Sequence, residues 1–146
     1  MQKLRFTANI NAPREKVWKV LWEDATYRVW TAPFAEGSYA ITDWKQGSKA
    51  LFLSPTGEGM VSRIEESREN EFMSIKHLGT VKDGVEDTTS EKVKQWAGGL
   101  ENYTLNATET GTDLIVELGA PDDFAKYFSE TFPLALEQVK LLAEKA

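Results

Sequence analysis

The chain has 146 residues, no cysteine and a net charge of −6, from 17 Lys and Arg against 23 Asp and Glu. This length predicts a single domain, residues 1–146, whose core is large enough to be stable without disulfides or metal ions. The absence of cysteine excludes disulfides, thiolate metal sites and a cysteine nucleophile. The acidic balance argues against nucleic acids and anionic membrane surfaces as partners, because both attract clustered positive charge.

The sequence opens with a short strand and a helix. Residues 4–10 alternate apolar and polar side chains, which predicts a half-buried strand. A helix is expected over residues 11–22, with Asn11 as its N-cap and Pro13 in its first turn.

A second short helix is expected from Asp24 to Trp30, with Asp24 as its cap and Pro33 ending it. Residues 1–20 are charged throughout and contain no apolar h-region, and no apolar run approaches the length of a membrane-spanning helix. We therefore expect a cytoplasmic protein with no membrane span.

Short strands dominate the middle of the chain. Four runs of strand length, each bounded by Gly, Pro, Asn or a charged turn, cover residues 37–43, 47–55, 57–67 and 71–81. Their spacing predicts an antiparallel meander. Residues 82–96 are polar and charged, and we expect a long loop with one helical turn that is a candidate lid. Residues 100–109 and 112–119 then predict a hairpin across a Thr110-Gly111 turn.

The chain closes with a long amphipathic helix, expected over residues 122–145 and capped by Asp122 or Asp123. Its apolar positions step by three or four residues, as one helical face requires, at 124, 128, 132, 135, 139 and 142. Pro133 lies inside this pattern and removes one helical hydrogen bond. We therefore expect a kink or a short break near Glu130 to Pro133.

This order of elements resembles the SRPBCC superfamily, whose helix-grip fold is shared by START lipid-binding domains and the birch-pollen allergens. The segments APREKVWKVLW, YRVWT, GSYAITDWKQGS, GEGMVSRIEESRENEFMSIKH and GGLENYTLNATETGTDLIVEL are similar, in that order, to the activator-of-heat-shock-protein-ATPase-homologue branch. The resemblance covers essentially the whole chain. It departs where members often place a Trp early in the last helix, since this chain has Phe124, Tyr127 and Phe128 there.

The resemblance implies an α+β helix-grip fold. In it a curved antiparallel sheet of about seven strands wraps on the long C-terminal helix, two short helices follow the first strand, and an apolar cavity lies between sheet and helix. It implies little chemistry, because members include lipid and hormone carriers, polyketide cyclases and co-chaperone domains.

An excess of aromatic residues, five Trp, four Tyr and seven Phe, is the compositional sign of such a cavity. The residues expected to line it are Trp30, Phe34, Met73, Ile75, His77, Trp96, Tyr103, Leu105, Phe124, Tyr127, Phe128 and Phe132. Trp96 and Phe128 are candidates for its mouth, whereas Trp30 and Trp44 are expected to pack mainly in the core. The alternative is that aromatic side chains at helical spacing form an ordinary core.

Two strand segments carry candidate functional residues, and of these His77 and Tyr103 are the catalytic candidates. His77, the only histidine, shares a strand face with Met73 and Ile75 and is of the type that exchanges protons near neutral pH. The alternative is a histidine satisfied by a backbone carbonyl or a tyrosine. Glu101 and Tyr103 share a strand face and are suited to orient a carbonyl ligand. The alternative places Glu101 in solvent at the end of the sheet and Tyr103 in the core with its hydroxyl at the rim.

The leading hypothesis is a non-catalytic binding protein for a small, largely apolar ligand of the lipid or polyketide class. One alternative is a protein-interaction module of the co-chaperone type, with a chaperone as partner. Another is a cyclase- or hydratase-like enzyme that uses His77 or Tyr103. One histidine and no cysteine do not make a transition-metal cluster, and no phosphate-binding glycine motif is present, so we expect no metal and no cofactor. A monomer is expected.

Overall fold

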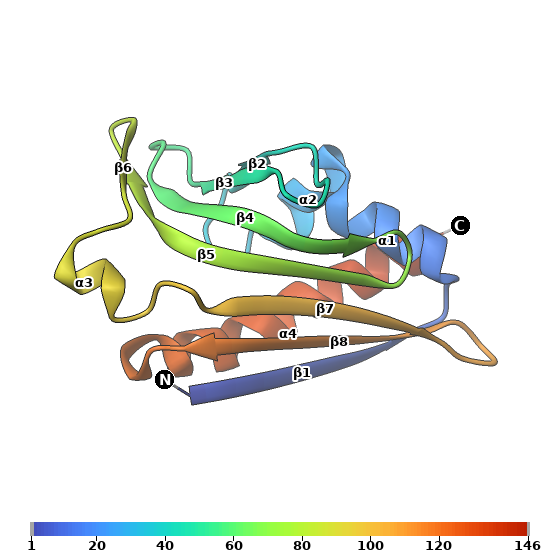
Figure 1. Cartoon of the computed structure of the whole chain (residues 1–146). Coiled ribbons are helices and arrows are strands. Elements are labelled where there is room, and N and C mark those ends of the chain that lie inside the picture. Colours follow the sequence, from blue (N-terminus) through green and yellow to red (C-terminus); the bar gives the residue numbers. More distant parts are fainter. Residues whose placement is uncertain (1, 146) are drawn as a thin grey trace.

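The computed structural model describes residues 2–145, and its strands form a single sheet that α1, α2 and α4 cover on one face (Figure 1). The elements in chain order are β1 Gln2–Ile10, α1 Arg14–Trp22, α2 Asp24–Trp30, β2 Tyr39–Ile41, β3 Lys49–Leu53, β4 Gly59–Arg68, β5 Phe72–Lys82, β6 Val85–Asp87, α3 Glu91–Lys94, β7 Leu100–Ala107, β8 Thr112–Ala120 and α4 Asp122–Glu144.

The strands form one antiparallel sheet in the order β1-β8-β7-β5-β4-β3-β2, with the short strand β6 paired to the end of β5. Helix α4 runs behind β7 and β8 in Figure 1, and it packs against β1, β8, α1 and α2. This arrangement confirms the α+β helix-grip fold, the predicted strand meander and the predicted hairpin. Within residues 2–145, no helix is both long and apolar enough to cross a membrane.

The core lies between the sheet and α4. Strand alternation turns every second side chain inward, as predicted for β1 and for the β7–β8 hairpin. From α4, the residues Phe132, Ala135 and Val139 are buried against this face, which confirms the predicted apolar stripe over most of the helix. Phe124 is an exception, because its side chain is 53% exposed. The packed stripe therefore begins one turn later than predicted, at Phe128.

The predicted cap of the first helix is wrong. Helix α1 begins at Arg14, and its N-cap is Pro13, which makes no side-chain capping hydrogen bond. Asn11 lies two residues earlier, and its backbone N–H instead donates to the carboxylate of Glu144 at the far end of the chain, at 2.9 Å. A contact between distant residues thus replaces the local cap that the sequence suggested.

The caps predicted for α2 and α4 are each one or two positions off. Glu23 is the N-cap of α2 and Pro121 that of α4, so Asp24, Asp122 and Asp123 lie in the first turns and not at the caps. These carboxylates still lie near the positive end of each helix dipole, where negative charge is favourable.

Helix α4 is continuous through Pro133, so the predicted short break does not occur. The proline removes the hydrogen bond to the carbonyl of Ser129, four residues earlier. Because Ser129 is exposed, water can satisfy that carbonyl and the helix needs no interruption.

The segment 82–96 contains the predicted helical turn, α3, and also the unpredicted strand β6. An Asp83-Gly84 turn joins β5 to β6, and both residues have positive φ, as tight hairpins prefer. At Gly79 the two strands approach so closely that a Cβ would lie 2.0 Å from the carbonyl oxygen of Asp87. A glycine is therefore required next to Thr80 and Asp87, the last residue pair between β5 and β6.

Candidate functional site

A chain of hydrogen bonds crosses three strands on the inner face of the sheet. The hydroxyl of Ser62 on β4 lies 2.8 Å from Nδ1 of His77 on β5. Nε2 of His77 lies 3.0 Å from Oε1 of Glu101 on β7, and the hydroxyl of Tyr103 donates to the other oxygen of Glu101. Two polar candidates from the sequence, the lone histidine and the Glu101–Tyr103 pair, therefore form a single cluster.

The strand register brings these side chains together. Ser62 is directly opposite His77, next to a bulge that shifts the pairing between Val61 and Ser62. Glu101 is opposite Ile75, two residues from His77, so the two side chains are diagonal neighbours on one face.

Glu101 remains ionised in this setting. Burial by itself raises the pKa of its carboxyl, but the hydrogen bond and charge of His77, together with the hydrogen bond from Tyr103, outweigh burial and hold that pKa below its ordinary value. Burial and the negative charge of Glu101 both raise the pKa of Tyr103 and the pKa of Tyr27 on α2. The site at neutral pH therefore holds one carboxylate among neutral phenols.

The hydrogen bonds allow one consistent arrangement of protons when the imidazole is neutral. Nε2 of His77 carries its proton and donates to the carboxylate of Glu101, so Nδ1 accepts from the hydroxyl of Ser62. A carboxylate that fixes the orientation of a histidine in this way is the usual support of a general acid or base. Ser62 itself has no exposed surface, which makes it a positioning group for the ring.

The cluster reaches solvent only partly. The side chains of His77 and Glu101 are 16% and 19% exposed, whereas Tyr103 is buried. Aromatic rings surround it: Trp22 contacts Tyr103 edge-on with ring centres 5.0 Å apart, and Phe52 lies 6.3 Å from the ring of His77. The indole N–H of Trp22 is buried and has no hydrogen-bond partner among residues 2–145.

The structure places the predicted cavity residues at three depths. Those in the core are Trp30, Met73, Ile75, Tyr103, Leu105 and Phe132. Those at intermediate depth are Phe34, His77, Trp96 and Phe128. Those that are exposed are Phe124, at 53%, and Tyr127, at 40%. Phe34, Phe128 and Phe132 pack together where the segment after α2 meets α4.

Aromatic rings fill much of the space between sheet and helix. Phe6 of β1 stacks on Phe132 of α4 at 4.9 Å, and Phe34 packs edge-on against Phe132 at 4.8 Å. Two grooves open elsewhere on the described surface, one of about 470 Å³ between β1 and α4 and one of about 380 Å³ beside α2. Neither is lined by residues predicted for the cavity, so that cavity stays a prediction.

The sequence did not identify Ser62, and the alternative that placed Glu101 in solvent is wrong. Glu101 is not solvated at the end of the sheet, because it accepts hydrogen bonds from both His77 and Tyr103. Ser62 gave no signal beyond its place in a strand, since its contact with His77 depends on the register and on the adjacent bulge. No group of three or more His, Cys, Asp or Glu side chains within the described part of the chain is arranged to hold a metal ion.

No family model and no curated protein matches the sequence, whereas many solved structures match its fold. One is the crystal structure of a protein from Chromobacterium violaceum, with a TM-score of 0.72 and 21% identity over all of both chains. The Aha1 dimer from Colwellia psychrerythraea matches at 0.72 and 17% identity, over 99% of this chain and 97% of that one. DynU16, from the dynemicin biosynthetic locus, matches at 0.71 and 12% identity, over 99% of this chain and 48% of that one.

Aha1 and DynU16 match this chain at nearly equal TM-scores. The structural similarities therefore do not distinguish the activator-of-heat-shock-protein-ATPase-homologue branch from others. At these sequence identities the similarities show the fold alone. Together with the sheet order and the position of α4, they establish that the chain has the helix-grip fold, as the resemblance to the SRPBCC superfamily implied.

Proposed function

We propose that this protein binds a small, largely apolar ligand of the lipid or polyketide class, and that His77 and Glu101 hold the polar group of that ligand. The observation that carries the proposal is the partial exposure of these two side chains, 16% and 19%, on the inner face of an aromatic-lined sheet. A few convergent polar groups within an apolar, aromatic wall are the usual composition of a small-molecule site.

The hydrogen-bonding capacity of the cluster indicates which ligand group fits. The Glu101 carboxylate offers about four acceptor positions, and His77 and Tyr103 occupy two of them. A ligand hydroxyl can therefore donate to Glu101 without displacing either partner. The indole N–H of Trp22, which has no partner within residues 2–145, is a further donor in the same aromatic wall. A phenol or an alcohol on an apolar skeleton satisfies these requirements.

A ligand needs room beside the cluster, and the half-buried rings Phe52, next to His77, and Trp44, next to Phe52, are the side chains that can move to provide it. Both lie at the edge of the core, so shifting them leaves the fully buried residues in place.

A two-dimensional amide NMR titration with a fatty acid, a sterol, a flavonoid and an aromatic polyketide tests this proposal. We expect saturable shifts at His77, Glu101 and residues 124–132 with at least one compound, and weaker binding of that compound by Glu101→Gln. The matched control is Glu109→Gln, the same change at an exposed position in the β7–β8 turn, which should bind normally. The absence of saturable shifts with all four compounds would overturn the proposal.

The same titration separates binding from catalysis. A histidine oriented by a carboxylate is suited to proton transfer, which keeps a cyclase- or hydratase-like reaction as an alternative use of the site. Turnover of a bound compound that His77→Gln abolishes, with binding and folding retained, would assign catalysis to this residue. Unchanged turnover in His77→Gln would remove it from consideration.

A second candidate function, a co-chaperone-like interaction module, is supported by the outer face of α4. Tyr127, Leu134 and Leu141 are spaced seven residues apart, and all three are exposed, as is Phe124 near the start of the helix. Apolar side chains gathered on one exposed face often mark a protein-binding surface. The resemblance of the sequence to the activator-of-heat-shock-protein-ATPase-homologue branch makes a chaperone ATPase the partner to test.

The double variant Leu134→Glu, Leu141→Glu tests this second function. It should abolish any stimulation of a heat-shock protein ATPase while leaving the fold intact, because both side chains are largely solvated. Lys126→Glu, on an exposed position of the same helix, is the control for added charge. The candidate is rejected if the wild-type protein does not stimulate the ATPase, or if the double variant stimulates it equally well.

A further inference from the structure

Strand β1 lies at one edge of the sheet, and its only strand partner within residues 2–145 is β8. An edge strand presents a row of backbone N–H and C=O groups that can pair with another extended chain. Only those residues of β1 whose N–H and C=O groups point away from β8 can form such a pair.

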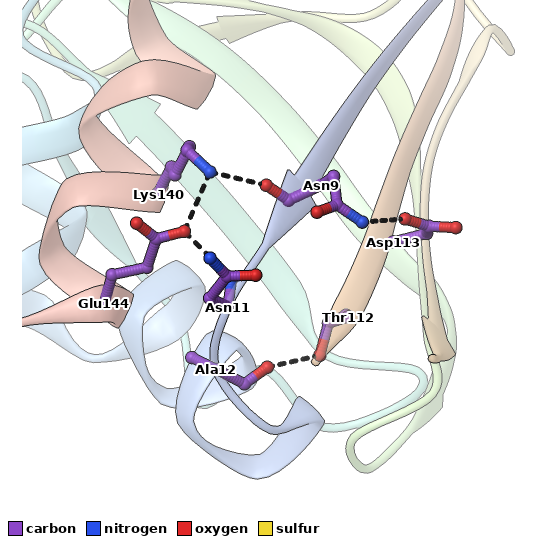
Figure 2. A network of polar contacts seen from close by, with 7 residues as sticks. All are labelled: Asn9, Asn11, Ala12, Thr112, Asp113, Lys140 and Glu144. Carbon is purple, nitrogen blue, oxygen red and sulfur yellow. Dashed lines mark hydrogen bonds and ion pairs between the residues drawn. The ribbon is translucent and has the colours of Figure 1, made fainter. Parts of the chain in front are cut away.

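The contacts at the end of β1 show which residues these are (Figure 2). The carbonyl of Asn9 accepts a hydrogen bond from Lys140 of α4 at 2.8 Å, and the N–H of Asn11 donates to Glu144 of the same helix. Odd-numbered residues therefore direct their backbone groups away from β8. The carbonyl of Ile10, in contrast, faces the start of β8, where it would lie 2.1 Å from a Cβ on Gly111.

Because backbone direction alternates along a strand, Arg5 and Thr7 also point their N–H and C=O groups outward. No other strand pairs with these groups in the described part of the chain. Along the same edge runs the groove of about 470 Å³ between β1 and α4. Its apolar lining is Phe6, Ala8, Pro133 and Leu136, and its polar lining is Arg5, Thr7, Asn9, Glu137 and Lys140.

We propose that this groove binds an extended segment of another protein, which adds to the sheet as a strand beside Arg5–Thr7. The outward backbone groups would supply the ladder hydrogen bonds, as in other cases of strand addition. Alternate side chains of the added segment would contact the apolar lining formed by Phe6, Pro133 and Leu136. The remaining side chains would lie on the other face, beside Arg5.

Charge complementarity makes the preferred segment acidic. Neither Arg5 nor the neighbouring Lys3 forms an ion pair within the described chain, although the protein as a whole carries a charge of −6. Acidic side chains on the solvent-facing side of the added strand would pair with these cations. The favoured occupant is thus a segment in which apolar and acidic residues alternate.

The same cations disfavour a second copy of this chain as the occupant. If two β1 strands paired antiparallel about Phe6, each Arg5 would be opposite Thr7, and the two Arg5 side chains would be diagonal neighbours on one face. Positive charges on an edge strand are a common protection against such self-pairing. Lys140 also donates a hydrogen bond to the carbonyl of Asn9, so the added strand should end before Asn9.

Fluorescence anisotropy with the labelled peptide Val-Glu-Val-Asp-Val-Glu-Val tests the proposal on the full chain. We expect saturable binding, with amide NMR shifts confined to residues 3–8 and 133–140. Two matched peptides are the controls: one with lysine at each acidic position, and one with N-methyl groups on alternate backbone amides. Both should bind at least about tenfold more weakly, because they lose the charge match and the ladder hydrogen bonds respectively.

The variant Arg5→Glu should bind the acidic peptide about tenfold more weakly and prefer the lysine peptide. Circular dichroism confirms its folding, and Arg5→Gln serves if Arg5→Glu does not fold. Equal binding of acidic and lysine peptides, full binding of the N-methylated peptide, or no binding at all would each overturn the proposal. A wild-type dimer in sedimentation whose interface is β1 would also overturn it, because the occupant would then be a second copy.

Discussion

Nε2 of His77 and Oε1 of Glu101 lie 3.0 Å apart, which joins β5 to β7 by a side-chain contact on the inner face of the sheet. The chain contains one histidine, and the fold pairs it with a carboxylate that is itself held by Tyr103. Since the two partners are more than four-fifths buried, their interaction is screened less by solvent than that of a surface ion pair.

Removing the carboxylate should strongly destabilise the protein. Glu101→Ala leaves the N–H of His77 and the hydroxyl of Tyr103 without their shared acceptor, and each unsatisfied donor costs about 1–3 kcal/mol. Glu101→Gln should cost less, because the amide oxygen still accepts one hydrogen bond. Urea unfolding measures both free energies. Glu109→Ala, at an exposed turn, should change the free energy of unfolding by less than about 0.5 kcal/mol. A stability of Glu101→Ala equal to wild type would contradict the role assigned to the pair.

The same carboxylate should make stability depend on pH in the acidic range. The pKa of Glu101 is lower in the folded protein than its ordinary value of 4.5, so the unfolded chain binds the proton more readily. Its stabilising contribution is therefore complete above about pH 4.5 and is lost as the pH falls below that value through the folded-state pKa.

Other carboxylates share this sign, since the pKa values of Asp43, Asp87 and Glu144 are also lowered by their hydrogen bonds. The measurement is therefore the difference in unfolding free energy between wild type and Glu101→Gln as a function of pH. That difference should shrink on acidification below pH 4.5. A difference that stays constant from pH 7 to pH 3 would show that the folded and unfolded pKa values of Glu101 are equal.

The sequence predicted the architecture because local patterns encode it. Alternation over residues 4–10 marks β1, and the three-and-four spacing of apolar residues marks α4. The errors arose where non-local contacts decide the outcome. Asn11 is not a cap because its N–H reaches Glu144, a residue 133 positions away. A pattern read along the chain contains no information about such a contact.

The candidate site was predictable as a set of residues and not as a network. Alternation correctly placed Glu101 and Tyr103 on one face, and likewise His77 with Ile75. Their mutual contact depends on which residues of β5 and β7 are opposite each other, and the contact with Ser62 depends also on a bulge. Because register is a property of paired strands, a single strand sequence specifies the faces but not the partners.

Ser62→Ala should change the state of the His77 ring. The substitution removes the hydroxyl that contacts Nδ1, so the proposed Nε2-protonated form loses its hydrogen-bond donor. Because His77 is the only histidine, its ¹⁵N imidazole signals need no assignment among competitors. We expect a clear shift of the Nδ1 resonance and a loss of about 1–3 kcal/mol of stability. Ser74→Ala, at another buried strand serine, should leave the imidazole signals unchanged. Identical imidazole spectra for Ser62→Ala and wild type would show that the Ser62 hydroxyl does not determine which nitrogen of His77 carries the proton.

Two buried tryptophans differ in whether the indole N–H forms a hydrogen bond, so the effects of replacing them can be compared. The indole N–H of Trp30 donates to the carbonyl of Leu21 at 3.1 Å, whereas that of Trp22 has no partner within residues 2–145. Replacement by phenylalanine removes similar ring volume at both positions. Trp30→Phe also removes a hydrogen bond, whereas Trp22→Phe removes a buried donor that was already unsatisfied. Urea unfolding should therefore show Trp30→Phe to be less stable than Trp22→Phe by about 1–3 kcal/mol.

This comparison also bears on the proposed ligand site. If the free N–H of Trp22 is retained to bind a ligand, Trp22→Phe should keep its stability and lose ligand affinity, and Trp30→Phe should show the reverse. A residue that only packs would lose stability without a separate effect on affinity. Equal stability losses for the two variants would contradict the difference in hydrogen bonding from which both expectations are derived.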